Sequence, residues 1–181
     1  MFVLIGAGGI LLVSISRASL EIMIKEEREG KLRTELVIID SVEIYKLPQS
    51  RILLNDKYYW LKEIRDWTWQ KFSFGEENKI RVWLILADKK VSEARALRGK
   101  EEYDLALKSY RKAIDQLKFA ESLARKIENN EIAKNQYKNQ IRKMAEVYQK
   151  MIEEIGKNDK IDEQKYLLLL QEINEFKEKQ N

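Results

Sequence analysis

Residues 80–127 read IRVWLILADKKVSEARALRGKEEYDLALKSYRKAIDQLKFAESLARKI, and this stretch decides the fold. Small and apolar residues recur every three or four positions on both sides of Gly99, which is the pattern of one buried stripe on each of two α-helices. The stripes are Ile80, Leu84, Ala87, Val91 and Ala94, then Tyr103, Ala106, Tyr110, Ala113, Leu117, Ala120, Leu123/Ala124 and Ile127. Two amphipathic helices joined by a short glycine turn bury their stripes against each other. The sequence therefore predicts an antiparallel helical hairpin.

A third stripe follows the dipeptide Asn129-Asn130, and a fourth follows Gly156. Their members are Ile132/Ala133, Tyr137, Ile141, Met144, Tyr148, Met151 and Ile155, then Ile161, Tyr166, Leu169/Leu170, Ile173 and Phe176. The sequence predicts two further helices, separated by a turn at Gly156. Because the asparagine-rich neck lacks a strong breaker, residues 101–155 could instead form one long helix. Such a helix would permit a coiled coil and self-association.

The amino-acid composition excludes many kinds of catalytic site. The 181 residues include no cysteine and no histidine. Disulfides, thiol nucleophiles, imidazole bases and zinc sites built on these side chains are therefore excluded. Adjacent carboxylates such as Glu153 and Glu154 project about 100° apart on a helix, so they do not converge on one substrate. We expect a protein that is not an enzyme, with no catalytic, cofactor-binding or metal-binding residues and no small-molecule substrate.

The net charge of +4 is diffuse. Nucleic-acid binding requires a concentrated basic stripe along one surface. The sequence shows no such stripe, so its charge pattern disfavours a nucleic-acid partner.

The N-terminal residues 2–16, FVLIGAGGILLVSIS, are uncharged and mostly apolar. A membrane-spanning helix needs roughly 20 apolar residues, so this segment is short for a span. It also lacks a preceding Lys or Arg, which a signal peptide usually has. We interpret residues 1–24 as a membrane anchor or signal-like segment, with a buried soluble helix as the alternative.

A linker is expected to join this segment to the helical domain. Residues 25–46 begin with a charged run and continue with β-branched stretches at 36–39 and 42–45, which could form short strands or an extended linker. The only proline, Pro48, favours a turn at the domain entrance. We therefore place a helical domain at residues 47–128 and the C-terminal helices at 129–181.

An aromatic helix is predicted over Lys57–Phe72, with Asn55-Asp56 as its N-cap. Trp60, Ile64 and Trp67 share one face, and the favoured interpretation is that this face is core covering the hairpin. The alternative is an interaction surface that stacks bases, rests at a bilayer interface or receives a partner helix. The candidate residues of that surface are Tyr59, Trp60, Lys62, Arg65 and Trp67.

Residues 47–126 resemble a recurring bacterial module known as domain of unknown function 5667. The resemblance rests on Leu47-Pro48-Gln49-Ser50, Tyr58-Tyr59-Trp60-Leu61-Lys62, Phe72-Ser73-Phe74-Gly75, Leu86-Ala87-Asp88-Lys89-Lys90, Glu93-Ala94, Gly99-Lys100 and Tyr110-Arg111-Lys112-Ala113. The chain departs from the family pattern by inserting residues between Ser50 and Tyr58 and by its Asp88-Lys89-Lys90. The resemblance implies a helical domain behind a signal or membrane segment in the bacterial envelope. It supplies no catalytic residues.

A second, local resemblance is to the helical hairpin of a tetratricopeptide repeat. It is carried by residues 99–106 followed by Tyr110-Arg111-Lys112-Ala113. Only one copy is visible, whereas a repeat array needs about three. Convergent packing of a helical hairpin is therefore the favoured explanation.

These observations predict an all-α fold. We expect a bundle of about four helices built on the hairpin, behind an N-terminal apolar helix and a short extended linker. The expected function is a membrane- or envelope-associated module that binds protein or the membrane surface, with membrane contact through residues 2–24 and a protein partner or self-association. The alternatives are a cytosolic tetratricopeptide-like adaptor that binds a peptide, and a single-stranded nucleic-acid binder that uses residues 57–72.

Overall fold

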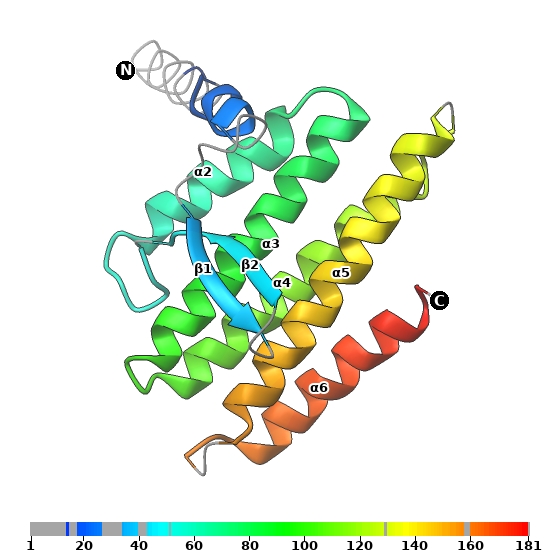
Figure 1. Ribbon diagram of the computed structural model, residues 1–181. Coiled ribbons are helices and arrows are strands. Elements are labelled where there is room, and N and C mark those ends of the chain that lie inside the picture. The colour runs from blue at the N-terminus through cyan, green and yellow to red at the C-terminus, as the bar shows by residue number, and fades with distance from the viewer. Residues whose placement is uncertain are drawn as a thin grey trace, which may run out of the picture.

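The computed structural model describes residues 14, 18–26, 34–39, 43–50, 52–128, 130–157 and 160–180, and this part of the chain is mostly helical (Figure 1). The all-α prediction is thus confirmed at the level of fold class. Of the anchor or signal-like segment predicted at residues 1–24, residues 14 and 18–24 are described, and the rest lies outside the described residues. The elements are β1 (Thr34–Ile39), β2 (Glu43–Pro48), α2 (Tyr59–Phe72), α3 (Glu76–Arg98), α4 (Tyr103–Ala124), α5 (Glu131–Ile155) and α6 (Glu163–Glu178), and residues 18–26 are also helical.

The predicted hairpin is confirmed as α3 and α4, which form the most extensive contact between elements. Every member of the α3 stripe is buried, and so is the α4 stripe except for the half-buried Tyr103 and Leu123. The connecting turn is closed by the amide of Glu102, which donates to the carbonyl of Leu97 at 3.0 Å. The residue before it, Glu101, has φ of +62°. The small residues of the two stripes allow the close approach of the helices.

Helix α3 is buried on a second side that the stripe did not predict. Its residues Val82, Ile85 and Leu86 form a separate apolar cluster with Trp69 of α2 and with Leu20, Met23 and Ile24 of the N-terminal helical residues. Figure 1 shows residues 18–26, in blue, beside α2 at the edge of the bundle. The indole nitrogen of Trp69 donates to Ser19 Oγ at 3.0 Å. Helix α3 is therefore covered by α4 on one side and by α2 and residues 18–26 on another.

Helices α5 and α6 complete the main core. The alternative of one long helix over residues 101–155 is wrong, because α4 ends at Ala124 and α5 begins at Glu131. Asn130 caps α5, since its Oδ1 accepts from the amide of Ala133 at 3.0 Å. Apart from the exposed Ile132, the predicted α5 stripe is buried, and α5 contacts α4 and α6 of the same chain. The face that suggested a coiled coil therefore packs within the chain.

The segment before the helical domain forms a β-hairpin, so of the two interpretations the short strands are confirmed. Strands β1 and β2 pair in antiparallel register, with Thr34 opposite Pro48 and Ile39 opposite Glu43. Strand β2 contacts α3, and its Leu47 is fully buried in the main core. Figure 1 shows the hairpin lying across the bundle.

Candidate interaction surface on helix α2

Helix α2 begins later than predicted. Its first residue is Tyr59, and Tyr58 is the N-cap without a side-chain capping bond. The predicted N-cap at Asn55-Asp56 is therefore wrong. Asp56 instead contributes its carbonyl oxygen, which accepts from the amide of Tyr59 at 3.0 Å. This backbone turn starts the helix without the help of a side chain.

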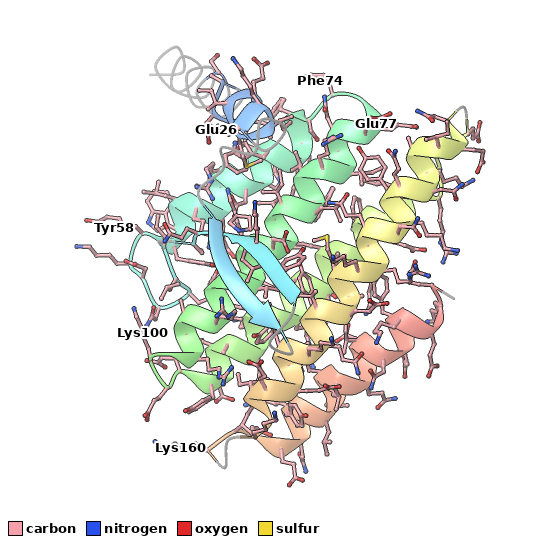
Figure 2. The ribbon with its side chains drawn as sticks, viewed as in Figure 1. Glu26, Tyr58, Phe74, Glu77, Lys100 and Lys160 are labelled. Atoms are coloured by element: carbon pink, nitrogen blue, oxygen red, sulfur yellow. The ribbon has the colours of Figure 1, made fainter. Side chains whose placement is uncertain are left out.

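Helix α2 exposes several large apolar residues and buries two charged ones. Its outer face, which we define as Trp60, Leu61, Ile64 and Trp67, is exposed to between 44% and 57%. The opposite face, with Lys62 and Asp66, is buried. The interpretation of Trp60, Ile64 and Trp67 as core is therefore wrong. Figure 2 shows the flanking residues Tyr58 and Phe74 at the edge of the molecule.

A buried ionic network holds the inner face of α2 against α3. Lys62 Nζ lies 2.6 Å from Glu93 Oε2 of α3, and both side chains are almost completely buried. The same ammonium donates to Ser50 Oγ at 2.9 Å and to the Ile52 carbonyl at 3.0 Å. Three acceptors thus satisfy its three N–H groups. Buried charges are tolerated when they are paired and hydrogen-bonded in this way.

A second lysine of α3 joins the network. Lys90 Nζ lies 3.4 Å from Glu93 Oε2 and also donates to the hydroxyl of Tyr59. Burial lowers the pKa of Lys90, although the charge of Glu93 opposes this shift. Burial, and after it the charge of Glu93, raises the pKa of Tyr59, so this hydroxyl stays protonated. The arrangement fastens α2 to α3 through polar contacts.

The structure divides the predicted interaction residues between the two faces. Trp60 and Trp67 are on the outer face, whereas Tyr59 and Lys62 are buried in the network. Arg65 lies between the faces. Its guanidinium Nη2 is 2.6 Å from Asp66 Oδ1, and its Cζ lies 4.5 Å from the centroid of the Trp69 ring. The five residues therefore do not form one surface.

Sequence reasoning missed two members of the exposed surface. Leu61 and Ile64 are both absent from the candidate surface residues, because the face that carries them was interpreted as core. The sequence did contain a signal. Lys62 and Asp66 are four residues apart and therefore lie on one face of their helix, and Lys90 and Glu93, three residues apart, lie on one face of the next helix. Two such faces can satisfy each other, which leaves the apolar face of α2 outside.

A cleft of about 320 Å³ lies next to Trp67, between α2, α3 and α4. Its wall carries charges of both signs, and Lys112 Nζ is bonded to Glu63 Oε1 there at 2.7 Å. The lining residues are Glu63, Asp66, Trp67, Gln70, Lys90, Lys112, Asp115 and Gln116. Among the residues described, no group of three or more acidic side chains is arranged to hold a metal ion.

A second polar cluster joins β2, α3 and α5. The hydroxyls of Tyr45 and Tyr148 donate to Asp88 Oδ1 at 2.9 and 2.7 Å. Burial raises the pKa of Asp88 to about 7, although both hydroxyl donors oppose the shift. The contact between the β-hairpin and the helices therefore contains a carboxyl group, that of Asp88, whose pKa lies near neutral pH.

In the part of the chain that the structure describes, no helix combines the length and the apolar character needed to cross a membrane.

The comparisons with known proteins identify the family. The family model described as "Domain of unknown function (DUF5667)" matches residues 51–180. No curated protein and no solved structure matches the chain. The matched region starts after Leu47–Ser50 of the resemblance and runs beyond Lys126 through α5 and α6. All five labelled helices thus fall inside the match, and the chain belongs to the DUF5667 family.

Proposed function

We propose that this protein is a non-enzymatic, membrane-associated module of the bacterial envelope whose outer face of α2 rests in the bilayer interface. The observation that carries the proposal is the joint exposure of Trp60, Leu61, Ile64 and Trp67 on one helical face. Tryptophan is enriched where a bilayer meets water, because its ring is apolar and its N–H is polar. An amphipathic helix lying in that plane needs an exposed apolar face of this kind.

The N-terminal sequence supports the same placement. The uncharged residues 2–16 precede the helical residues 18–26, which pack against Trp69 of α2. If residues 2–16 enter a membrane, α2 is held close to its surface. The exposed Lys57 and Lys71, at the two ends of the aromatic stretch, suit contact with anionic headgroups.

The nucleic-acid alternative has less support. It assigns the contacts with phosphates to Lys62 and Arg65, beside Trp60 and Trp67. Lys62 is committed to Glu93, and Arg65 is bonded to Asp66. A peptide groove between α3 and α4, as in the adaptor alternative, has no support either, since these helices bury their stripes against each other.

Fluorescence quenching in vesicles tests the proposal. The full chain is reconstituted in vesicles of phosphatidylcholine and phosphatidylglycerol, with or without bromine on the acyl chains. We expect brominated lipid to quench the wild-type emission. In the conservative variant Trp60→Phe/Trp67→Phe, which leaves Trp69 and Trp83 as emitters, we expect most of this quenching to be lost.

The aqueous quencher acrylamide provides the opposing measurement. It should reach Trp60 and Trp67 in detergent and reach them less in vesicles. Equal acrylamide quenching in both, together with no effect of brominated lipid on the wild type, would show that the outer face does not contact the bilayer. A protein partner would then be the better explanation of its exposure.

A further inference from the structure

A second cavity lies where the end of α4, the start of α5 and the end of α6 meet. Its volume is about 430 Å³. The residues that line it are Glu121, Ala124, Arg125, Lys134, Lys138, Ile141, Lys179 and Gln180. None of them belongs to α2 or to its ionic network, so the cavity is independent of the outer face.

The lining of this cavity is strongly basic. It contains four cationic side chains and the single carboxylate of Glu121, which is already bonded to Arg125. Lys134 has a weak contact with Glu131, at 3.3 Å between two surface groups. Such exposed pairs contribute little and exchange readily with other partners. The cavity therefore presents more positive charge than its own acidic group can balance.

A buried amide adds a directional donor. Gln180 is only 3% exposed and forms part of the wall. Among the described residues, its Nε2 is buried without a hydrogen-bond partner. Buried donors in native structures are almost always paired, so an unpaired donor in the wall of a basic cavity favours an acceptor bound there. An acceptor oxygen inside the basic cavity would complete it.

We propose that this cavity binds a phosphate group. A phosphate oxygen would accept from Gln180 Nε2, and the other oxygens would face Arg125, Lys134, Lys138 and Lys179. Phosphate suits the site better than a carboxylate, because it carries more negative charge and more acceptor oxygens for a guanidinium and several ammonium groups. The group belongs either to a free phosphate or to the headgroup of an anionic lipid.

Calorimetric titration of the full chain in a non-ionic detergent tests the site. One arm uses inorganic phosphate, and the other uses dihexanoyl-phosphatidylglycerol below its micelle concentration, both at constant ionic strength against chloride. Saturable heat in either arm supports the site, and the arm with the lower Kd identifies the source of the phosphate group. Heat no larger than that of chloride in both arms would overturn the proposal.

Three variants locate the binding. Lys138→Glu is at an exposed position and should weaken binding by at least about tenfold, since it removes one charge-assisted bond and adds a repelling charge. Gln180→Met, of similar shape and without a donor, should also weaken it. Lys100→Glu makes the same charge change near the other end of α4, roughly 33 Å away along a helix of 22 residues. It should bind like the wild type, and an equal loss in Lys100→Glu and Lys138→Glu would reduce the effect to net charge and refute the site.

Discussion

Replacing Glu93 with glutamine should destabilise the protein far more than an ordinary loss of an ion pair. Glu93 is fully buried and is the shared acceptor of Lys62, at 2.6 Å, and of Lys90, at 3.4 Å. Glutamine keeps the shape of the side chain but removes its charge. Both ammonium groups then stay in the interior beside a neutral amide.

The size of the effect follows from this burial. Removing one partner of a buried ion pair typically costs about 3–5 kcal/mol, because the remaining charge is left uncompensated. Here two lysines, both at most 5% exposed, lose the same carboxylate. A change of 1 kcal/mol moves the Tm of a protein of this size by about 2–4 °C. We therefore expect the Tm of Glu93→Gln to fall by roughly 6–20 °C.

The assays are thermal unfolding, which gives the Tm, and urea unfolding, which gives the free energy of unfolding, both followed by far-ultraviolet circular dichroism with Glu154→Gln as the matched control. Glu154 pairs with Arg98 at 3.1 Å on the surface, where such pairs contribute only about 0–1 kcal/mol. The double variant Lys62→Met/Glu93→Gln should recover part of the loss, since it no longer buries the lysine closest to Glu93. A loss below about 1 kcal/mol in Glu93→Gln, equal to that in Glu154→Gln, would refute the account of the network.

Three further predictions concern other parts of the fold. Asp88 has a folded pKa raised to about 7, so its protonated form stabilises the fold; this stability is complete below the unfolded pKa of 3.8 and is lost as the pH rises through 7. Relative to the wild type, Asp88→Asn should thus gain up to about 3 kcal/mol in unfolding free energy between pH 5 and pH 8, and an unchanged difference would contradict the shift. Gly156→Ala would place its Cβ in steric overlap with Cζ and the hydroxyl of Tyr166 and should lower stability by about 1–3 kcal/mol. Gly99→Ala, with its nearest neighbour at 3.5 Å, should be neutral or stabilising in thermal melts. Asn130→Ala should cost about 1 kcal/mol through the lost cap of α5, and Asn130→Ser should restore most of it; equal melting of the two variants would show that the cap does not matter.

The sequence allowed the hairpin and the C-terminal helices to be predicted because their burial follows a single rule. In α4 and α5 every third or fourth residue is apolar and faces another apolar stripe, so the pattern of one helix is enough to orient it. The break between α4 and α5 does not follow from that rule, because Asn130 starts α5 through a specific capping bond and not through apolar spacing. The β-hairpin was ambiguous for a related reason, since β-branched residues fit both a strand and an extended linker.

The orientation of α2 could not be predicted by that rule. The side chains of one helix do not show which face is buried when the neighbouring helix presents charges. Lys90 and Glu93 lie on α3 away from its apolar stripe, on the side that meets α2. Without polar partners from α2 they would be buried and incompletely paired. The contact between Lys62 and Glu93 determines which face of α2 is buried. The sequence does not reveal this contact, because the two residues are 31 positions apart.

The orientation of α2, with its charged residues buried and its tryptophans exposed, also connects the stability of the fold to the proposed function. If α2 turned its outer face inward, Trp60 and Trp67 would be buried, but Glu93 would lose Lys62 and Lys90 would lose Tyr59. The ionic network therefore fixes the rotation of α2 about its own axis. Two aromatic side chains remain in solvent as a direct result. A soluble surface gains nothing from that exposure, whereas a bilayer interface or a bound partner does. The buried charges on the inner face of α2 and the exposed tryptophans on its outer face thus both follow from the orientation of this helix.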